Sequence, residues 1–338
     1  MEQRLFETRL SDGTRVAYAA VGRGPVLLHA PGWLTHLEHG WTIPQERAFY
    51  ERLARGRTLV RYDRPGCGLS DREPHRPPSL DLEAEIVGAV ADAVGAERVE
   101  LFGASLGVAA AVAWAAANPA RVSRLVLYGG WARGSELGTP EVREQVLGLV
   151  EAHWGLGSGV LADIFAPSAD PTTQAAFADY QRAAAEPATV RALLELAHAL
   201  DLTGLLPQIS APTLVVQREQ DRAAPYAQAE ELAAGIRRAR LVGLPGRDHL
   251  PYIGDADALV DTVRRFLGLS ASRSPGGVLT PRQREVAALV AQGLSNREIA
   301  DRLVITERSA ESHVERIRIR LGFRSRAQVA AWVARGGS

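Results

Sequence analysis

The chain of 338 residues carries 39 basic and 39 acidic side chains, and 46% of its residues are hydrophobic, which indicates a globular protein large enough for two domains. Its one cysteine excludes an internal disulfide, and no Cys and His cluster has metal-ligand spacing, so we expect no metal and no cofactor. The sequence has no signal-peptide pattern and no apolar run long enough to span a bilayer, so we expect a cytoplasmic protein that does not enter a membrane.

Residues 1–268 alternate strand-like and helix-like segments that are joined by short connections. This alternation predicts an α/β fold in which helices cover both faces of a mostly parallel sheet. A hairpin is expected at 7–21, and two of the helical patterns occupy 80–94 and 106–118. The apolar segments predicted as further strands are 25–30, 58–62, 99–102, 125–128, 213–217 and 239–242.

The strand predicted at 99–102 runs directly into the stretch 103–107 (GASLG) and then into an alanine-rich helix. Glycines permit the close backbone approach of a tight strand-to-helix turn, which exposes a serine hydroxyl at the start of the helix. In this context the pattern predicts that Ser105 is the nucleophile of a serine hydrolase. The alternative is a glycine turn with a structural role only.

A nucleophilic serine needs a base, and the base needs a carboxylate to orient it. His249 lies in a loop after the last predicted strand, and Asp221 lies in the loop after the strand at 213–217. Two other carboxylates, Glu219 and Asp248, lie on the same loops and are rivals for the orienting role.

These features resemble α/β-hydrolase fold proteins over the whole N-terminal region, and the stretch 62–71 (YDRPGCGLSD) is also typical of that family. The resemblance implies that Ser105 is the nucleophile, His249 the general base and Asp221 its orienting acid. It favours Asp221 over its rivals because Pro225 follows it at the spacing found in the family.

The resemblance also implies an oxyanion hole made of two backbone N–H groups. One belongs to Leu106, which follows the serine, and the other to the loop after the strand at 25–30. In that loop the family often has His-Gly followed by an apolar residue, whereas this chain has Pro-Gly-Trp at 31–33. Trp33 is therefore the expected second donor, in a loop that departs from the family pattern.

Residues 131–207 interrupt the strand alternation and are predicted as helices, at the position where the family inserts a cap over the active site. Aromatic residues and a histidine of this segment are expected mainly in the core of the cap: Trp131, His153, Trp154, Phe165, Phe177 and Tyr180. His29, at a strand end, is expected to be structural. The residues expected to line a ligand pocket are Trp33, His36, Ser105, Trp131 and His249.

A stretch rich in Ser, Pro and Gly at 269–278 is predicted as a linker. Four short amphipathic helices are expected beyond it, opened by the capping residues Thr280, Ser295, Thr306 and Ser325. The second and third would form a helix-turn-helix. Residues 271–338 hold twelve arginines and six acidic residues, a basic balance that indicates contact with nucleic-acid phosphates. The alternative is a helical bundle whose surface charge has no such role.

The segment 279–338 resembles the LuxR-type DNA-binding domain in its opening at 279–286 (LTPRQREV) and in the stretch 293–300 (GLSNREIA), and in His-Val and Leu-Gly at either end of 313–322. The resemblance implies that 306–321 is the recognition helix and that the fourth helix pairs two protomers. The residues expected to approach DNA are Arg308, Ser309, Glu311, Ser312, Glu315 and Arg316.

The sequence thus predicts a homodimeric transcriptional regulator that binds double-stranded DNA and whose α/β-hydrolase region binds a small ester or lactone, with hydrolysis of that ligand left open. The alternative is a serine hydrolase of carboxylic esters or lactones whose DNA-binding tail regulates or localises it. A third possibility is a binding module in which the triad residues are inert, because a fold does not dictate its chemistry.

Overall fold

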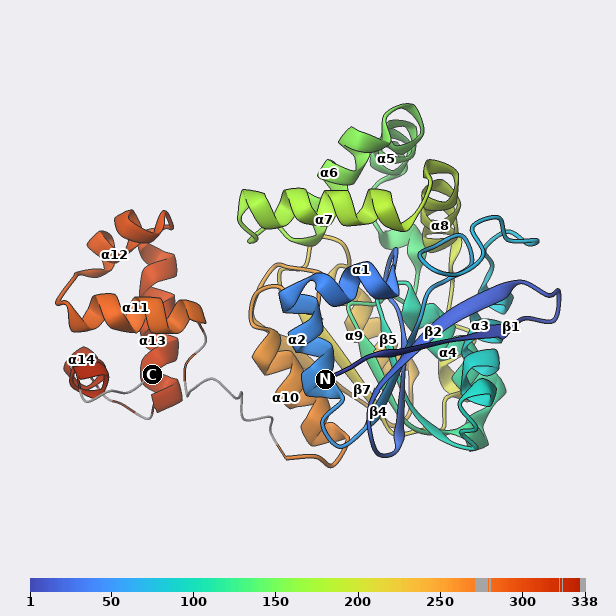
Figure 1. Cartoon of the computed structure of the whole chain (residues 1–338), viewed down its shortest axis with the longest axis horizontal. Helices are drawn as coiled ribbons and strands as arrows, with labels where there is room; N and C mark the ends of the chain where they lie inside the picture. The colour runs from blue at the N-terminus through green and yellow to red at the C-terminus, as the bar shows by residue number, and fades with distance from the viewer. Residues whose placement is uncertain (271–278, 280, 322, 324, 335–338) are drawn as a thin grey trace. The chain divides into compact units, whose positions relative to one another are not determined.

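The computed structural model describes residues 1–270, 279, 281–321, 323 and 325–334. The chain divides into two compact units, Met1–Ala271 and Ser272–Ser338, which are treated separately (Figure 1). Most of the predicted linker, at 271–278, lies outside the described residues, and so does the predicted helix cap Thr280. Among the described residues, no helix has the length and apolar character that crossing a membrane requires.

An eight-stranded sheet forms the centre of the first unit, in the order β1-β2-β4-β3-β5-β6-β7-β8 (Figure 1). β1 and β2 form the predicted antiparallel hairpin, β2 is also antiparallel to β4, and the other neighbouring strands are parallel. The prediction of a mostly parallel α/β sheet is confirmed. The strands are β1 (Arg4–Arg9), β2 (Arg15–Gly22), β3 (Val26–Ala30), β4 (Thr58–Tyr62), β5 (Val99–Ala104), β6 (Val122–Tyr128), β7 (Thr213–Arg218) and β8 (Ala239–Leu244).

Helices cover both faces of this sheet, because alternate strand residues point to opposite sides. Leu28 joins a hydrophobic cluster with α3, α4 and α9, whereas its neighbour Leu27 joins a second cluster with α2 and α10. Both leucines are fully buried. The helices around the sheet are α1 (Leu37–Thr42), α2 (Pro44–Leu53), α3 (Leu80–Ala93), α4 (Gly107–Ala117), α9 (Tyr226–Gly235) and α10 (Ala256–Phe266). Short 3-10 turns lie at Pro119–Arg121, Gly134–Glu136 and Leu206–Gln208.

Four further helices lie between β6 and β7 in the chain and gather at one end of the first unit (Figure 1). Each has proline or a capping side chain at its start, which satisfies or removes the N–H groups that a first helical turn leaves unpaired. Their inner faces join the cluster that contains α3 and α4. They are α5 (Pro140–Ala152), α6 (Trp154–Phe165), α7 (Pro171–Ala184) and α8 (Pro187–Ala199).

A buried ion pair joins the loop after β4 to helix α3. The guanidinium Nε of Arg64 lies 2.8 Å from a carboxylate oxygen of Glu83, and the two residues are 1% and 2% exposed. The remaining guanidinium nitrogens donate to two backbone carbonyls of the loop after β3, Nη1 to Trp33 (3.0 Å) and Nη2 to Pro31 (2.5 Å). A single side chain therefore fixes the loop that follows β3.

The second unit contains α11 (Pro281–Ala291), α12 (Asn296–Leu303), α13 (Glu307–Leu321) and α14 (Arg326–Ala334), packed on one apolar core. The predicted capping box is present, since Ser295 and Glu298 each accept from the other's backbone N–H. α12 ends at Leu303, and the C-cap residue Val304, whose φ is 53°, turns the chain sharply toward α13. The four-helix unit with a helix-turn-helix is confirmed.

Replacing Arg64 with methionine should lower the free energy of unfolding by about 3–5 kcal/mol, because the carboxylate of Glu83 would stay buried without its cation. Adding Glu83→Leu should recover part of this loss. Arg76, which is 38% exposed and pairs with Asp12 and Glu85, provides the matched control. Arg76→Met should cost about 1 kcal/mol or less in urea titrations. Equal losses for the two arginines would contradict this account of the buried pair.

Candidate functional site

Ser105 stands in a strained turn between β5 and α4. Its φ is 50°, in the left-handed region that non-glycine residues rarely adopt. The neighbouring glycines make this turn possible: a Cβ on Gly103 would lie 2.6 Å from the Gly107 oxygen, and one on Gly107 would lie 2.2 Å from the Ala30 oxygen. The turn therefore requires glycine on both sides of the serine, as the sequence pattern predicts.

The structure brings Ser105, His249 and Asp221 into one hydrogen-bonded row. Ser105 Oγ lies 2.7 Å from His249 Nε2, and His249 Nδ1 lies 2.8 Å from Asp221 Oδ2. A carboxylate accepts hydrogen bonds, so Nδ1 carries the proton and Nε2 is free to accept the serine proton. His249 and Asp221 are 4% and 9% exposed, which shields this row from water.

The carboxylate of Asp221 is held in place by its own loop. Its Oδ1 accepts from the backbone N–H groups of Ala223 (2.9 Å) and Ala224 (3.3 Å), and its Oδ2 accepts from the amide of Gln217 (3.1 Å). These three donors fix the direction in which the carboxylate meets the histidine.

The two rival carboxylates lie elsewhere. Glu219 is exposed. Asp248 is buried but accepts from the backbone N–H of Ser168 (2.9 Å) and from its hydroxyl. Asp248 therefore ties the last loop of the sheet to the segment after α6, and Asp221 is the carboxylate that reaches the histidine.

In this structure the predicted oxyanion donor at Leu106 is occupied by the chain itself, and its role toward a bound ligand stays a prediction. The Leu106 N–H donates to the carbonyl oxygen of Gly32, at 3.2 Å. The reason is the conformation of the 31–33 loop, whose flanking carbonyls at Pro31 and Trp33 are both held by Arg64. The peptide group that joins Gly32 to Trp33 lies between these two carbonyls, and its oxygen is the one that accepts from Leu106.

A small cavity of about 50 Å³ lies beside Ser105. Ligand sites commonly measure about 300–1,000 Å³, so this cavity is smaller than most ligands need. Trp33, Ser105 and His249 line it as predicted, together with residues that the sequence analysis did not single out for the pocket. Those residues are His29, Glu46, Tyr50, Tyr128, Phe165, Phe177, Tyr180, Leu250, Pro251 and Tyr252, along with loop residues 31, 32, 34 and 35 and Ala104.

Two predicted pocket residues lie outside this cavity. His36 caps α1, where its Nδ1 accepts from the N–H of His39 (3.3 Å), and its backbone N–H donates to Tyr180 (3.0 Å). Trp131 is 6% exposed and its indole N–H donates to the carbonyl of Ala197 (3.2 Å). Both side chains are therefore used in packing and capping, and their assignment to the pocket is corrected.

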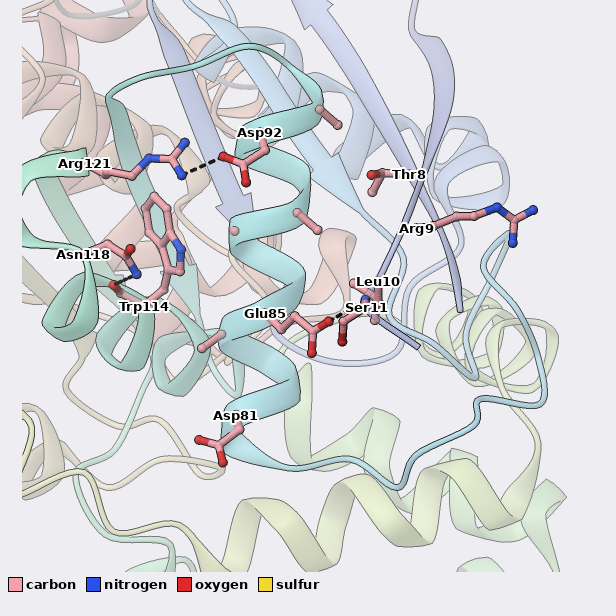
Figure 2. A pocket seen from close by; sticks show the side chains of 14 residues that line it. Thr8, Arg9, Leu10, Ser11, Asp81, Glu85, Asp92, Trp114, Asn118 and Arg121 are labelled. Carbon is pink, nitrogen blue, oxygen red and sulfur yellow. Dashed lines mark hydrogen bonds and ion pairs between the residues drawn. The ribbon is translucent and has the colours of Figure 1, made fainter. Parts of the chain in front are cut away.

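Figure 2 shows a larger and more open groove, of about 650 Å³, between β1, α3 and α4. Its polar groups satisfy one another: Glu85 accepts from the backbone of Ser11 (2.8 Å), and Arg121 pairs with Asp92 (2.6 Å). None of its lining residues belongs to the Ser105 row. The smaller cavity, and not this groove, contains Ser105 and His249.

Helix α13 of the second unit turns Ala310, Val314 and Ile317 into the core, which leaves the opposite face outside. Arg308, Glu311, Glu315 and Arg316 are exposed on that face, and Ser309 and Ser312 are partly buried. The hydroxyl of Ser309 lies 2.8 Å from that of Thr306, at the start of the helix. Glu315 pairs with Arg318 (2.6 Å), which offsets part of the negative charge on this face.

Comparison with known proteins assigns both units. Residues 26–262 match the alpha/beta hydrolase family, and residues 277–333 match the family described as bacterial regulatory proteins, luxR family. A 2-hydroxy-6-oxononadienedioate/2-hydroxy-6-oxononatrienedioate hydrolase of Pseudomonas putida is 30% identical, over 71% of this chain and 83% of its own. A putative HTH-type transcriptional regulator of Mycobacterium bovis is 44% identical over 62 residues, 18% of this chain and 7% of that protein.

Solved structures agree for the first unit. The enol-lactonase from Burkholderia xenovorans LB400 is 29% identical with a TM-score of 0.66, and the match covers 78% of this chain and 100% of that one. A hydrolase from Pseudomonas aeruginosa PA01 is 28% identical with a TM-score of 0.68, over 78% and 98% of the two chains. The chain therefore belongs to the alpha/beta hydrolase family, and its residues 277–333 are a luxR-type DNA-binding region.

Proposed function

We propose that this protein is a ligand-responsive regulator, which binds DNA as a homodimer in the cytoplasm and whose hydrolase-fold unit binds a small ester or lactone at Ser105. The observation that carries the proposal is a complete row of Ser105, His249 and Asp221 in a chain that also has a luxR-type region. A hydrolase needs no such region for its chemistry, whereas a regulator needs both a ligand site and a DNA-binding surface.

The same row supports hydrolysis of the bound ligand. Ser105 Oγ would attack the carbonyl carbon while His249 Nε2 takes its proton, and the alcohol would leave as His249 returns that proton. Water, activated by His249, would then cleave the acyl-serine and release the acid. Asp221 stabilises the protonated imidazole throughout, through its 2.8 Å contact with Nδ1.

Both steps would be slowed while the Gly32 oxygen occupies the Leu106 N–H, since one missing oxyanion donor typically costs about 10²–10³ in rate. Rotation of the peptide between Gly32 and Trp33 would withdraw the Gly32 oxygen from Leu106 and turn the Trp33 N–H toward Ser105 in the same movement. Gly32 suits this rotation, since glycine has the widest backbone freedom. Arg64 holds the carbonyls on either side, so the movement stays local. A resting state that a ligand must open is suited to sensing.

A serine hydrolase of esters or lactones that a DNA-binding tail localises is the second candidate. It is supported by the names of the relatives, which include an enol-lactonase, and by the intact row of side chains. The regulator and the hydrolase differ in whether a ligand in the Ser105 pocket changes the affinity for DNA. A binding module whose Ser105, His249 and Asp221 are inert would bind the ligand without hydrolysing it.

Ser105→Ala should abolish hydrolysis of short acyl esters and lactones, with a loss in kcat of at least about 10³-fold, because the nucleophile is removed. Ser210→Ala, at an exposed position of the same unit, is the control and should retain full activity. A substantial rate in the Ser105→Ala protein would reject the triad.

DNA binding should require residues 278–338 and weaken steeply with salt, because arginines displace counterions from phosphates. Arg308→Ala and Arg316→Ala should each lower the slope of log affinity against log salt by about one. Arg191→Ala, which changes a side chain that is 40% exposed on α8 of the first unit, should leave the slope unchanged. In a mobility-shift assay on DNA selected from a random library, half-sites should lie about 10 base pairs apart. Retained binding after deletion of 278–338 would overturn the assignment.

A further inference from the structure

The cavity beside Ser105 contains a carboxyl group that hydrolysis does not use. Glu46, in the first turn of α2, lines this cavity and is 5% exposed. Its Oε1 lies 3.5 Å from Nη1 of Arg61. Its Oε2 is buried and accepts no hydrogen bond within the part of the chain that the structure describes. An unsatisfied buried carboxylate oxygen is costly, so a ligand group in this cavity that reaches Oε2 would supply the hydrogen bond that this oxygen lacks.

The groups around Glu46 limit which ligand atoms it can receive. Tyr50, Tyr180 and Tyr252 line the same cavity, so a ligand meets phenol rings and hydroxyls there. The guanidinium of Arg61 stacks on the Tyr50 ring, 4.0 Å from its centroid. Glu46 and Tyr50 line the cavity, whereas Arg61 lies behind them and does not. A ligand anion would therefore meet the carboxyl first, and a ligand cation would be opposed by Arg61 beyond it.

An uncharged hydroxyl group avoids both penalties. Burial raises the pKa of Glu46 to about 7 and the charge of Asp63 adds to this effect, whereas Arg61 and a hydrogen bond with Tyr252 lower the pKa. Near neutral pH the carboxyl is therefore present in both forms. A hydroxyl can donate to the carboxylate and can accept from the carboxylic acid, so it satisfies either form, which a methyl group cannot do.

We propose that Glu46 binds a hydroxyl group of the ligand, apart from the bond that Ser105 attacks, so that the pocket selects hydroxylated esters or lactones. This inference rests on the proposed function in one respect: it assumes that the ester group of the ligand lies at Ser105. It also sets this chain apart from relatives named for dioate substrates, since a terminal carboxylate would face Glu46.

The test uses full-length Ser105→Ala protein, which binds without turnover, and calorimetry with three ligands of equal chain length. Ethyl 6-hydroxyhexanoate should bind about tenfold more tightly than ethyl hexanoate, as one hydrogen bond to a buried charged group would give. Monoethyl adipate, which ends in a carboxylate, should bind most weakly. Failure of hydrolysis in the unaltered protein would leave these affinities unchanged, so the two proposals can fail separately.

Glu46→Leu in the same background should abolish the preference for the hydroxyl ligand. Glu51→Leu, the same change on the same helix at a residue paired with Arg47 outside the cavity, should retain it. If Glu46→Leu does not fold, Glu46→Gln should improve binding of monoethyl adipate, because the negative charge is lost while the shape is kept. Equal affinity for the hydroxyl and methyl ligands, no binding by either, or an unchanged preference in the Glu46 variants would overturn the inference.

Discussion

The hydrolase site depends on the buried guanidinium of Arg64. It neutralises Glu83 on α3 and at the same time holds the carbonyls of Pro31 and Trp33, so it positions the loop beside the serine. A buried ion pair of this kind adds little net stability compared with apolar packing, but losing one partner is expensive. Here the pair positions the backbone: Arg64 holds the carbonyls on either side of the peptide between Gly32 and Trp33, whose own carbonyl accepts from Leu106 instead.

That arrangement explains the closed state of the site. The Gly32 oxygen occupies the Leu106 N–H, and the cavity beside Ser105 measures only about 50 Å³. Phe165, Phe177 and Tyr180, from the segment between β6 and β7, form part of its wall. A ligand must therefore move the 31–33 loop, these aromatic residues, or both. Binding that requires such movement couples occupancy to conformation, which is the physical requirement for a sensor.

The sequence predicted the features that local backbone rules determine. Two glycines around Ser105 specify a strained turn, and strand ends place Asp221 and His249 on loops at the same edge of a parallel sheet. The filled oxyanion hole could not be predicted in this way, because it depends on how Arg64 packs, and no local pattern encodes that contact.

The sequence analysis missed other pocket residues for a similar reason. Glu46 lies in a polar stretch of α2 that is typical of a solvated helix face, and only the tertiary fold shows that it is 5% exposed. His36 and Trp131 have the chemistry of ligand contacts, but the structure uses them as a helix cap and a cap-core donor. Both residues make capping or packing contacts, and neither lines the cavity beside Ser105.

If the protein is a sensor, occupancy of the Ser105 pocket should change its affinity for DNA. The most direct measurement is fluorescence anisotropy of selected operator DNA, with protein whose Ser105 has been labelled by an alkyl fluorophosphonate, a reaction that joins oxygen to phosphorus and expels fluoride. Mass spectrometry establishes occupancy, and Ser105→Ala protein treated in the same way is the control. The account predicts a change in operator affinity of about tenfold on labelling. Identical affinities for the labelled and unlabelled protein would contradict it.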